Sequence, residues 1–185
     1  MAPTEPMTAA PTEPIRPSAS VPDWTREAKS FWAWNPSRSL LASIRAYQRR
    51  HGSPHPGDVA LRKFAVLRHR FWSVVTGTDI PINCRLAGGL LMPHPNGIVI
   101  HSDARVGPNC LIFQQVTLGG SADGAPVIGG NVDIGAGAKI LGRVTIGDHA
   151  LIGANAVVLS DVPGSATAVG VPAKVLRNAE RSGLR

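Results

Sequence analysis

The chain lacks any run of eighteen apolar residues, so the sequence offers no segment that could span a membrane. Its first residues, MAPTEPMTAAPTEPIRP, also lack the apolar core of a signal peptide, and a cytoplasmic protein is the default expectation. This segment is rich in proline and has almost nothing to bury. Residues 1–22 are therefore expected to form a disordered tail.

Cysteine is scarce, since the 185 residues include only Cys84 and Cys110. Free cysteine behaves as a small buried hydrophobe, so a structural role is expected for both rather than catalysis or a disulfide. Acidic residues are also few, with 12 against 19 basic ones and a net charge of +7. The chain shows no known nucleic-acid-binding motif. The basic excess before residue 71 is read as a solvated helical face, with attraction for an anionic substrate or cofactor as the alternative.

What the chain does contain is a ladder of aliphatic residues spaced six apart. Its cleanest stretch is Ile128, Ile134, Ile140, Ile146, Ile152 and Val158. Small or β-branched residues follow the first five rungs after four positions: Val132, Ala138, Val144, Ala150 and Ala156. Neither an α-helix nor an ordinary strand has a period of six. A hexapeptide repeat is typical of a parallel β-helix, in which each short face adds one rung to a continuous core.

Two earlier runs keep the same period: Ile80, Leu86, Met92 and Ile98, then Ile100, Val106, Ile112 and Leu118. The register slips by two residues between Ile98 and Ile100. A glycine-rich segment, residues 119–126, separates Leu118 from Ile128. Because repeat proteins place insertions in loops on a face that often binds, this segment is a candidate wall of an active site.

The predicted fold is mainly β, a parallel β-helix preceded by a small α-helical cap. Three six-residue faces make one turn of eighteen residues. A prism this short has little interior and flat sides, so we expect a homotrimer with sites between subunits. Residues 23–77 are expected to be helical, 78–176 to form the β-helix with a C-terminal strap, and 177–185 a flexible tail.

Within the helical region, Asn35 and Pro36 are expected to be the N-cap and first residue of one helix. Asp58 is expected to cap a second helix that runs to about Val75.

His94 is the histidine best placed for chemistry. It lies between Pro93 and Pro95, just before the register slip, and is presented at an irregular edge. An eighteen-residue turn would bring position 97 above Asp79, so Asp79 and His94 are expected near one corner. An aspartate bonded to one ring nitrogen prepares the other for general-base work. The alternative is a capping aspartate and a surface histidine.

Several segments together resemble the serine acetyltransferases of the hexapeptide-repeat superfamily. They are Asp79-Ile80, His94, residues 97–100, Gln115-Val116-Thr117-Leu118-Gly119-Gly120, residues 134–142 and Gly170-Val171-Pro172-Ala173-Lys174. The resemblance covers about Asp79 to Leu176. It implies a left-handed coil and acetyl-CoA as cosubstrate, with no metal.

The resemblance also implies the roles of individual residues. His94 is the general base and Asp79 its orienting partner. The backbone N–H near Gly120 is the candidate oxyanion donor. Pantetheine would run past Ala136 and Ala154, and Lys174 would meet a phosphate of CoA. No residue is placed as a covalent nucleophile, so direct transfer is expected.

The family's acceptor-binding groups are absent at two places. Pro93 replaces an aspartate, and Gly124-Ala125 replaces an arginine–histidine pair. The expected acceptor is L-serine or a similar small molecule, with a sugar or other non-amino-acid alcohol as the alternative. The short helical region leaves trimer and dimer of trimers open. Because the chain ends at Arg185 and not at isoleucine, docking to cysteine synthase is unsupported.

Two other classes remain as competitors. A zinc hydratase on the same coil would commonly use a His-x-x-x-x-His pair, which the sequence lacks. A non-catalytic trimeric scaffold is the other, and the presence of both Asp79 and His94 argues against it.

Overall fold

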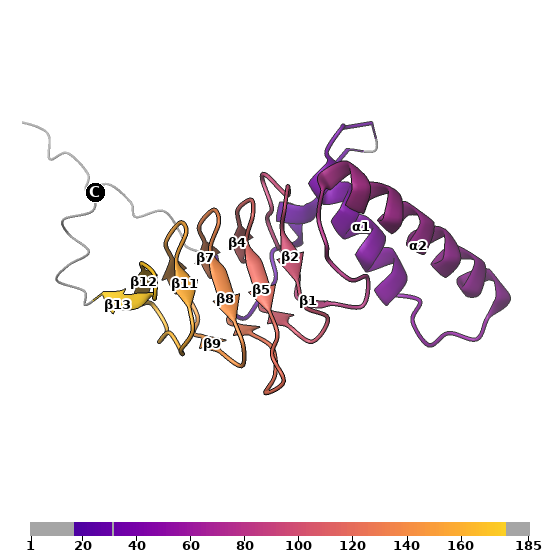
Figure 1. Ribbon diagram of the computed structural model, residues 1–185. Helices are drawn as coiled ribbons and strands as arrows, with labels where there is room; N and C mark the ends of the chain where they lie inside the picture. Colours follow the sequence, from indigo (N-terminus) through magenta and orange to yellow (C-terminus); the bar gives the residue numbers. More distant parts are fainter. Residues whose placement is uncertain (1–16, 31, 177–185) are drawn as a thin grey trace, which may run out of the picture.

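The computed structural model describes residues 17–30 and 32–176. A helical hairpin stands at one end of a stack of short parallel strands (Figure 1). The helical elements are η1 (Trp24–Glu27), α1 (Pro36–Gln48) and α2 (Pro56–Thr76). None of the described helices is long and apolar enough to cross a membrane.

The strands form three sheets, one on each face of the coil. One sheet contains β1 (Arg85–Leu86), β3 (Arg105–Val106), β6 (Val127–Ile128) and β9 (Thr145–Ile146). The second contains β4 (Leu111–Ile112), β7 (Asp133–Ile134), β10 (Leu151–Ile152), β12 (Thr167–Val169) and β13 (Lys174–Leu176). The third contains β2 (Val99–Ile100), β5 (Thr117–Gly119), β8 (Lys139–Leu141) and β11 (Val157–Val158). The predicted parallel β-helix with a helical cap is confirmed.

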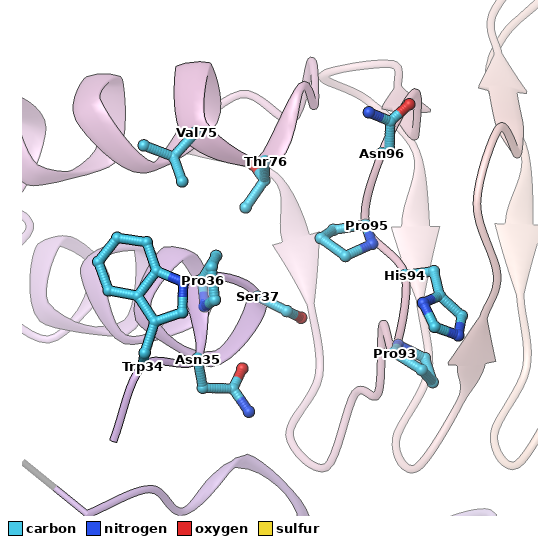
Figure 2. A pocket seen from close by; sticks show the side chains of 10 residues that line it. All are labelled: Trp34, Asn35, Pro36, Ser37, Val75, Thr76, Pro93, His94, Pro95 and Asn96. Atoms are coloured by element: carbon cyan, nitrogen blue, oxygen red, sulfur yellow. The ribbon is translucent and has the colours of Figure 1, made fainter. Parts of the chain in front are cut away.

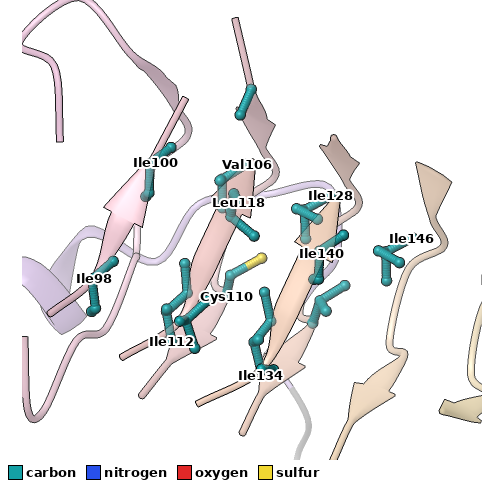
Figure 3. Packing of buried hydrophobic residues seen from close by; sticks show 14 of the residues in the cluster. Ile98, Ile100, Val106, Cys110, Ile112, Leu118, Ile128, Ile134, Ile140 and Ile146 are labelled. Carbon is teal, nitrogen blue, oxygen red and sulfur yellow. The ribbon is translucent and has the colours of Figure 1, made fainter. Parts of the chain in front are cut away.

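The spacing of six places one side chain of each strand inside the coil. Every aliphatic rung predicted from the sequence is buried, including Ile98, Ile134 and Ile140 (Figure 3). Burial of each such side chain contributes about 1.5–3 kcal/mol to stability. The five small partners named above are buried too, whereas Asn96 and Ala122, at the equivalent positions of the earlier runs, are exposed. Both exceptions fall where the repeat is interrupted.

The interruptions change the length of individual turns. Val127 pairs with Thr145, which is the expected eighteen residues away. Arg85 pairs with Arg105, and Arg105 with Val127, so these turns hold twenty and twenty-two residues. The two extra residues lie in the corner between Leu91 and Val99, and the four extra ones lie in the glycine-rich loop. The prediction that position 97 stands above Asp79 is therefore wrong, because Asp79 bridges Val99 instead.

The two helices form as local signals dictate, with one difference at the start of α2. Asn35 caps α1, and its side chain accepts a hydrogen bond from the Arg38 N–H at 3.0 Å. α2 begins at Pro56, where the His55 side chain accepts from the Gly57 N–H at 3.2 Å. Asp58, the predicted cap, instead accepts a hydrogen bond from Ser53. Proline at the first helical position moved the cap upstream.

The second helix, α2, buries few of its residues. Only Ala65 and Thr76 of this helix are buried. Several of its large apolar residues are exposed in this single chain: Leu61, Phe64, Leu67, Phe71, Val74 and Val75. α1 occupies the place next to the coil, where Leu40, Leu41 and Ile44 join the continuous core.

The segment that precedes η1 is held on the coil. The buried Asn109 side chain accepts a hydrogen bond from the Asp23 N–H and donates to the carbonyls of Ser18 and Val21. A Cβ built on Gly130 would lie 1.8 Å from the Ala19 carbonyl oxygen, so only glycine admits this approach. The structure thus holds residues 18–22 against the coil, while residues 1–16 and 177–185, which also belong to the predicted tails, lie outside the described residues.

One buried ion pair ties the helical cap to the first turn of the coil. The Arg45 guanidinium lies 2.9 Å from Glu27 and also donates to the carbonyls of Leu86 and Ala87. Glu27 in turn accepts from the Leu90 N–H at 3.1 Å. At the other end, β13 turns back and pairs antiparallel with β12; this C-terminal segment is called the C-terminal strap below.

Candidate active site

His94 stands in the corner of the coil that carries two extra residues. Its side chain is exposed. The corner is held by the Gly97 N–H, which donates to the Gly77 carbonyl at 2.8 Å, and by the Gln115 N–H, which donates to Asn96 at 2.9 Å. Neighbouring turns therefore fix the backbone while the imidazole stays free to meet a ligand.

A pocket of about 470 Å³ lies between this corner and the helical cap (Figure 2). Residues 34–37, Val75 and Thr76 line its helical side, and residues 93–96 line its coil side. His94 is the only titratable residue among them. Trp34 is fixed at the mouth by an edge contact with Trp72, with the ring centroids 5.5 Å apart.

Asp79 lies at the start of the coil, directly before the first rung, Ile80. Its backbone pairs with Ile98 and Ile100, and its side chain is exposed. Within the described part of this chain, no hydrogen bond joins the Asp79 carboxylate to His94. The dyad therefore stays a prediction.

Ala136 and Ala154 share the corner of His94 on later turns of the coil. The Asn155 N–H donates to the Ala136 carbonyl at 2.8 Å, so the two alanine positions stack on successive turns. Ala136 is half-buried and Ala154 is exposed. Neither side chain extends beyond Cβ, so no long side chain covers the backbone at these two positions.

Gly120 lies at a different corner of the same chain. It opens the loop of residues 119–126, and a Cβ built there would lie 2.9 Å from the His101 ring. The structure thus separates Gly120 from His94 within one chain. Lys174 is exposed on β13, where it pairs with Val169.

Sequence reasoning did not connect His101, whose side chain is exposed, with Gly120. Its ring lies against Gly120, and its Nδ1 accepts from the Asp103 N–H at 3.2 Å. The signal was available in the repeat, since a turn of eighteen residues stacks His101 beneath Gly119. The backbone confirms this neighbourhood, because the His101 N–H donates to the Leu118 carbonyl at 2.8 Å.

The two cysteines do not take part in the site. Both thiols are free and buried. Burial raises the pKa of Cys84 to about 11, with the nearby Asp79 and Asp103 adding to the effect. Burial likewise raises the pKa of Cys110 to about 11. Neither thiol is a nucleophile at neutral pH, because the thiolate is the reactive form.

Among the described residues, no cluster of three or more His, Cys, Asp or Glu side chains is arranged to hold a metal ion.

Comparison with known proteins gives a consistent picture. A family model described as bacterial transferase hexapeptide (six repeats) matches residues 125–160. A serine acetyltransferase of Synechococcus elongatus is 45% identical over 116 residues, which are 60% of this chain and 46% of that protein. The chain thus spans about half the length of such relatives.

Solved structures extend the likeness to the helical cap. The serine acetyltransferase of Neisseria gonorrhoeae in complex with serine matches with a TM-score of 0.66 and 38% identity, over 78% of this chain and 58% of that one. A serine acetyltransferase in complex with CoA matches with a TM-score of 0.64 and 34% identity, over 77% and 58%. The soybean serine acetyltransferase apoenzyme matches with a TM-score of 0.57 and 35% identity, over 77% and 70%.

Proposed function

Because this chain belongs to the serine acetyltransferase family, we propose that it is an acetyl-CoA-dependent O-acetyltransferase that acts on the hydroxyl of L-serine or a similar small acceptor. The observation that carries the proposal is the shared corner of His94, Ala136 and Ala154. A candidate base stands at one end of an accessible strip of backbone and beside a pocket. That is the arrangement that a long thioester donor and a small acceptor require.

His94 acts as the general base in this proposal. A ring nitrogen takes the proton of the acceptor hydroxyl while the oxygen attacks the thioester carbonyl carbon. The carbon–sulfur bond then breaks, and the imidazolium returns the proton to the leaving thiolate. Such proton transfer typically contributes about 10²–10⁴-fold to the rate. Asp79 is proposed to orient the ring.

Binding of acetyl-CoA is proposed along the corner that carries Ala136 and Ala154. Small side chains there leave backbone amides open, and a family member has been solved with CoA. Lys174 lies beyond these turns, on the C-terminal strap, where its ammonium can meet a phosphate. The developing oxyanion needs a preorganised donor, for which the Gly120 N–H is proposed.

A homotrimer reconciles the positions of Gly120 and His94. The two residues lie at different corners of one chain, so a loop from a neighbouring subunit can bring Gly120 to the His94 of the next. Large apolar side chains remain exposed on the faces of the coil, including Val127, Leu141 and Leu151. A dimer of trimers is the alternative assembly. A cytoplasmic location remains part of the proposal.

The test is a thiol-release assay with acetyl-CoA and a panel of small hydroxyl acceptors. Wild-type protein should release CoA with at least one acceptor, and His94→Ala should lose about 10²–10⁴-fold of that rate. His51→Ala, which changes a histidine in the loop between the helices, is the matched control. Absence of CoA release with every acceptor would favour the scaffold, and full activity of His94→Ala would remove the assigned base.

A further inference from the structure

The pocket beside His94 is lined by neutral groups. Apart from His94 itself, its lining consists of apolar side chains such as Trp34 and Val75 and uncharged polar ones such as Ser37 and Asn96. We infer that its acceptor is a neutral carbohydrate, whose ring stacks on Trp34 and whose hydroxyl groups bond the polar side chains. This inference rests on the proposed acetyl transfer and puts a carbohydrate in place of L-serine as the acceptor.

The absence of charge in the lining weighs against a free amino acid. L-serine carries an ammonium and a carboxylate close to its hydroxyl. Burying either charge without a partner costs free energy. Arg38 lines the adjoining smaller pocket rather than this one, and its guanidinium donates to the Ala28 carbonyl. Within one chain, the pocket thus offers no charged side chain besides His94. The loop of residues 119–126, which a neighbouring subunit would bring, carries only Asp123 and no cation for the carboxylate.

The Ser37 hydroxyl is a polar group of the pocket. Its side chain is only 7% exposed, and within the described residues its hydroxyl makes no hydrogen bond. Figure 2 shows that hydroxyl directed from α1 toward the coil side of the pocket. The hydroxyl is therefore open to the pocket, where a ligand hydroxyl could bond it as donor or acceptor.

Other polar groups around Ser37 divide into occupied and available ones. The Thr76 hydroxyl bonds the Trp72 carbonyl at 2.6 Å and is thus engaged within the helix. The Asn35 side-chain oxygen caps α1, which leaves its NH₂ group for a ligand. No hydrogen bond involves the Asn96 side chain within the described part of the chain. The available groups are therefore a hydroxyl and neutral amides, which match sugar hydroxyls.

Trp34 adds an aromatic surface that a small amino acid would not use. Its side chain is exposed, yet Trp72 holds it by an edge contact, and Phe71 contacts Trp72 with ring centroids 5.0 Å apart. A fixed indole presents a broad apolar face. The C–H face of a sugar ring stacks on such a surface while its rim hydroxyls reach polar neighbours. The volume of about 470 Å³ also lies within the range of small-molecule sites, roughly 300–1,000 Å³.

The test compares kcat/KM for L-serine with kcat/KM for D-glucose, D-galactose, D-mannose and N-acetyl-D-glucosamine, by CoA release from acetyl-CoA. We expect at least one sugar to exceed L-serine by about tenfold or more, which corresponds to about 1.4 kcal/mol. A higher kcat/KM for L-serine than for every sugar overturns the carbohydrate inference and leaves the acetyl transfer standing.

Variants assign the effect to the pocket. Trp34→Ala should raise KM for the preferred sugar about tenfold with little change in kcat, and Ser37→Ala should also raise KM. Ser39→Ala is the matched control, because Ser39 is a buried serine of α1 outside the pocket lining. An unchanged KM in both pocket variants overturns the assignment.

A binding measurement separates the two proposals if no acceptor is turned over. Titration calorimetry of the same sugars, in the presence of CoA, reports the pocket without chemistry. Sugar binding that Ser37→Ala weakens supports the pocket while the acetyl transfer fails. Neither binding nor turnover with any sugar overturns the carbohydrate inference as well.

Discussion

At the scale of the residue, the corner around His94 depends on two prolines and an insertion. Pro93 and Pro95 restrict the backbone on both sides of the histidine. The two extra residues push the segment out of the regular stack, so the imidazole is exposed while its neighbours in the ladder are buried. A histidine at a regular inward position would be desolvated and could not reach a substrate.

Asp79 provides a prediction at this scale. If its carboxylate orients the His94 ring in the assembled enzyme, Asp79→Asn should lower kcat and leave KM nearly unchanged. The loss in kcat should be at least about tenfold and should stay below that of His94→Ala, for which a loss of about 10²–10⁴-fold is expected. Steady-state kinetics with saturating acetyl-CoA measure it. Asp103→Asn, which changes an exposed carboxylate on the next turn of the coil, is the control. Equal rates for the two variants would remove Asp79 from the mechanism.

The thiols provide a second prediction. Since burial raises the pKa of Cys84 and Cys110 to about 11, neither should react with a thiol reagent in the native protein at pH 8. Two thiols should react at once after denaturation. Because the folded state keeps both thiols protonated above the ordinary thiol pKa of about 9, the free energy of unfolding should fall as pH rises from about 9 to about 11. Rapid labelling of either cysteine in native protein would contradict the described burial.

At the scale of the element, the N-terminal segment depends on one side chain. Asn109 has a left-handed backbone, with φ at 60°, and its amide makes three hydrogen bonds to residues 18–23. None of residues 18–23 is itself buried, so their position depends on this contact.

Asn109→Ala should therefore release residues 18–23 and destabilise the fold. Three lost hydrogen bonds at about 0.5–1.5 kcal/mol each suggest a loss of roughly 1.5–4.5 kcal/mol in the free energy of unfolding. Urea denaturation measures the loss, and hydrogen exchange locates it. Asn155→Ala is the control, because Asn155 also has a left-handed φ, at 56°, but makes none of the hydrogen bonds to residues 18–23. Similar exchange rates at residues 18–23 in both variants would show that Asn109 does not hold this N-terminal segment.

The contact between α2 and the coil should depend on pH. A ring nitrogen of His69 lies 2.9 Å from the Ile80 carbonyl oxygen. Burial lowers the pKa of His69, and the hydrogen bond to Ile80 opposes that effect only in part. The folded state therefore favours the neutral ring. This contribution is complete above the unfolded pKa of about 6.5 and is lost as pH falls through the lower folded value.

Urea denaturation at pH 7.5 and pH 5 tests the prediction. The free energy of unfolding should fall between the two, and His69→Gln, which keeps a donor but does not titrate, should show a smaller fall. The same fall in the variant would exclude His69 as its source.

At the scale of the whole molecule, two apolar surfaces remain uncovered in the single chain. One lies on the coil faces, where Val127, Leu141 and Leu151 are about 40% exposed. The other is the outer stripe of α2, including Phe64 and Phe71. Val127, Leu141 and Leu151 each lie on a different face of the coil, and exposed apolar side chains on every face are compatible with neighbours packed around it.

Light scattering should therefore give a mass of three copies of the 19.4 kDa chain. A mass of six copies would indicate the dimer of trimers. In that case, Phe64→Glu combined with Phe71→Glu should return the mass to three copies if the stripe on α2 joins the trimers. A monomer at micromolar concentration would contradict the trimer and the role proposed for Gly120.

The sequence by itself determined the coil, because a period of six is a local property that states which side chains face inward. The positions of Ile128 to Val158, the cap at Asn35 and the turn after Thr76 all follow from neighbours a few residues apart. It also located His94 as an exception to the ladder. The tertiary structure decided what depends on contacts between distant segments. It placed Asp79 opposite Val99, seated residues 18–23 on Asn109 and set Gly120 at another corner from His94. It also turned the apolar face of α2 outward, since α1 already covers the end of the core. These outcomes reflect competition for the same buried surface, which hydrophobic spacing along one segment does not encode.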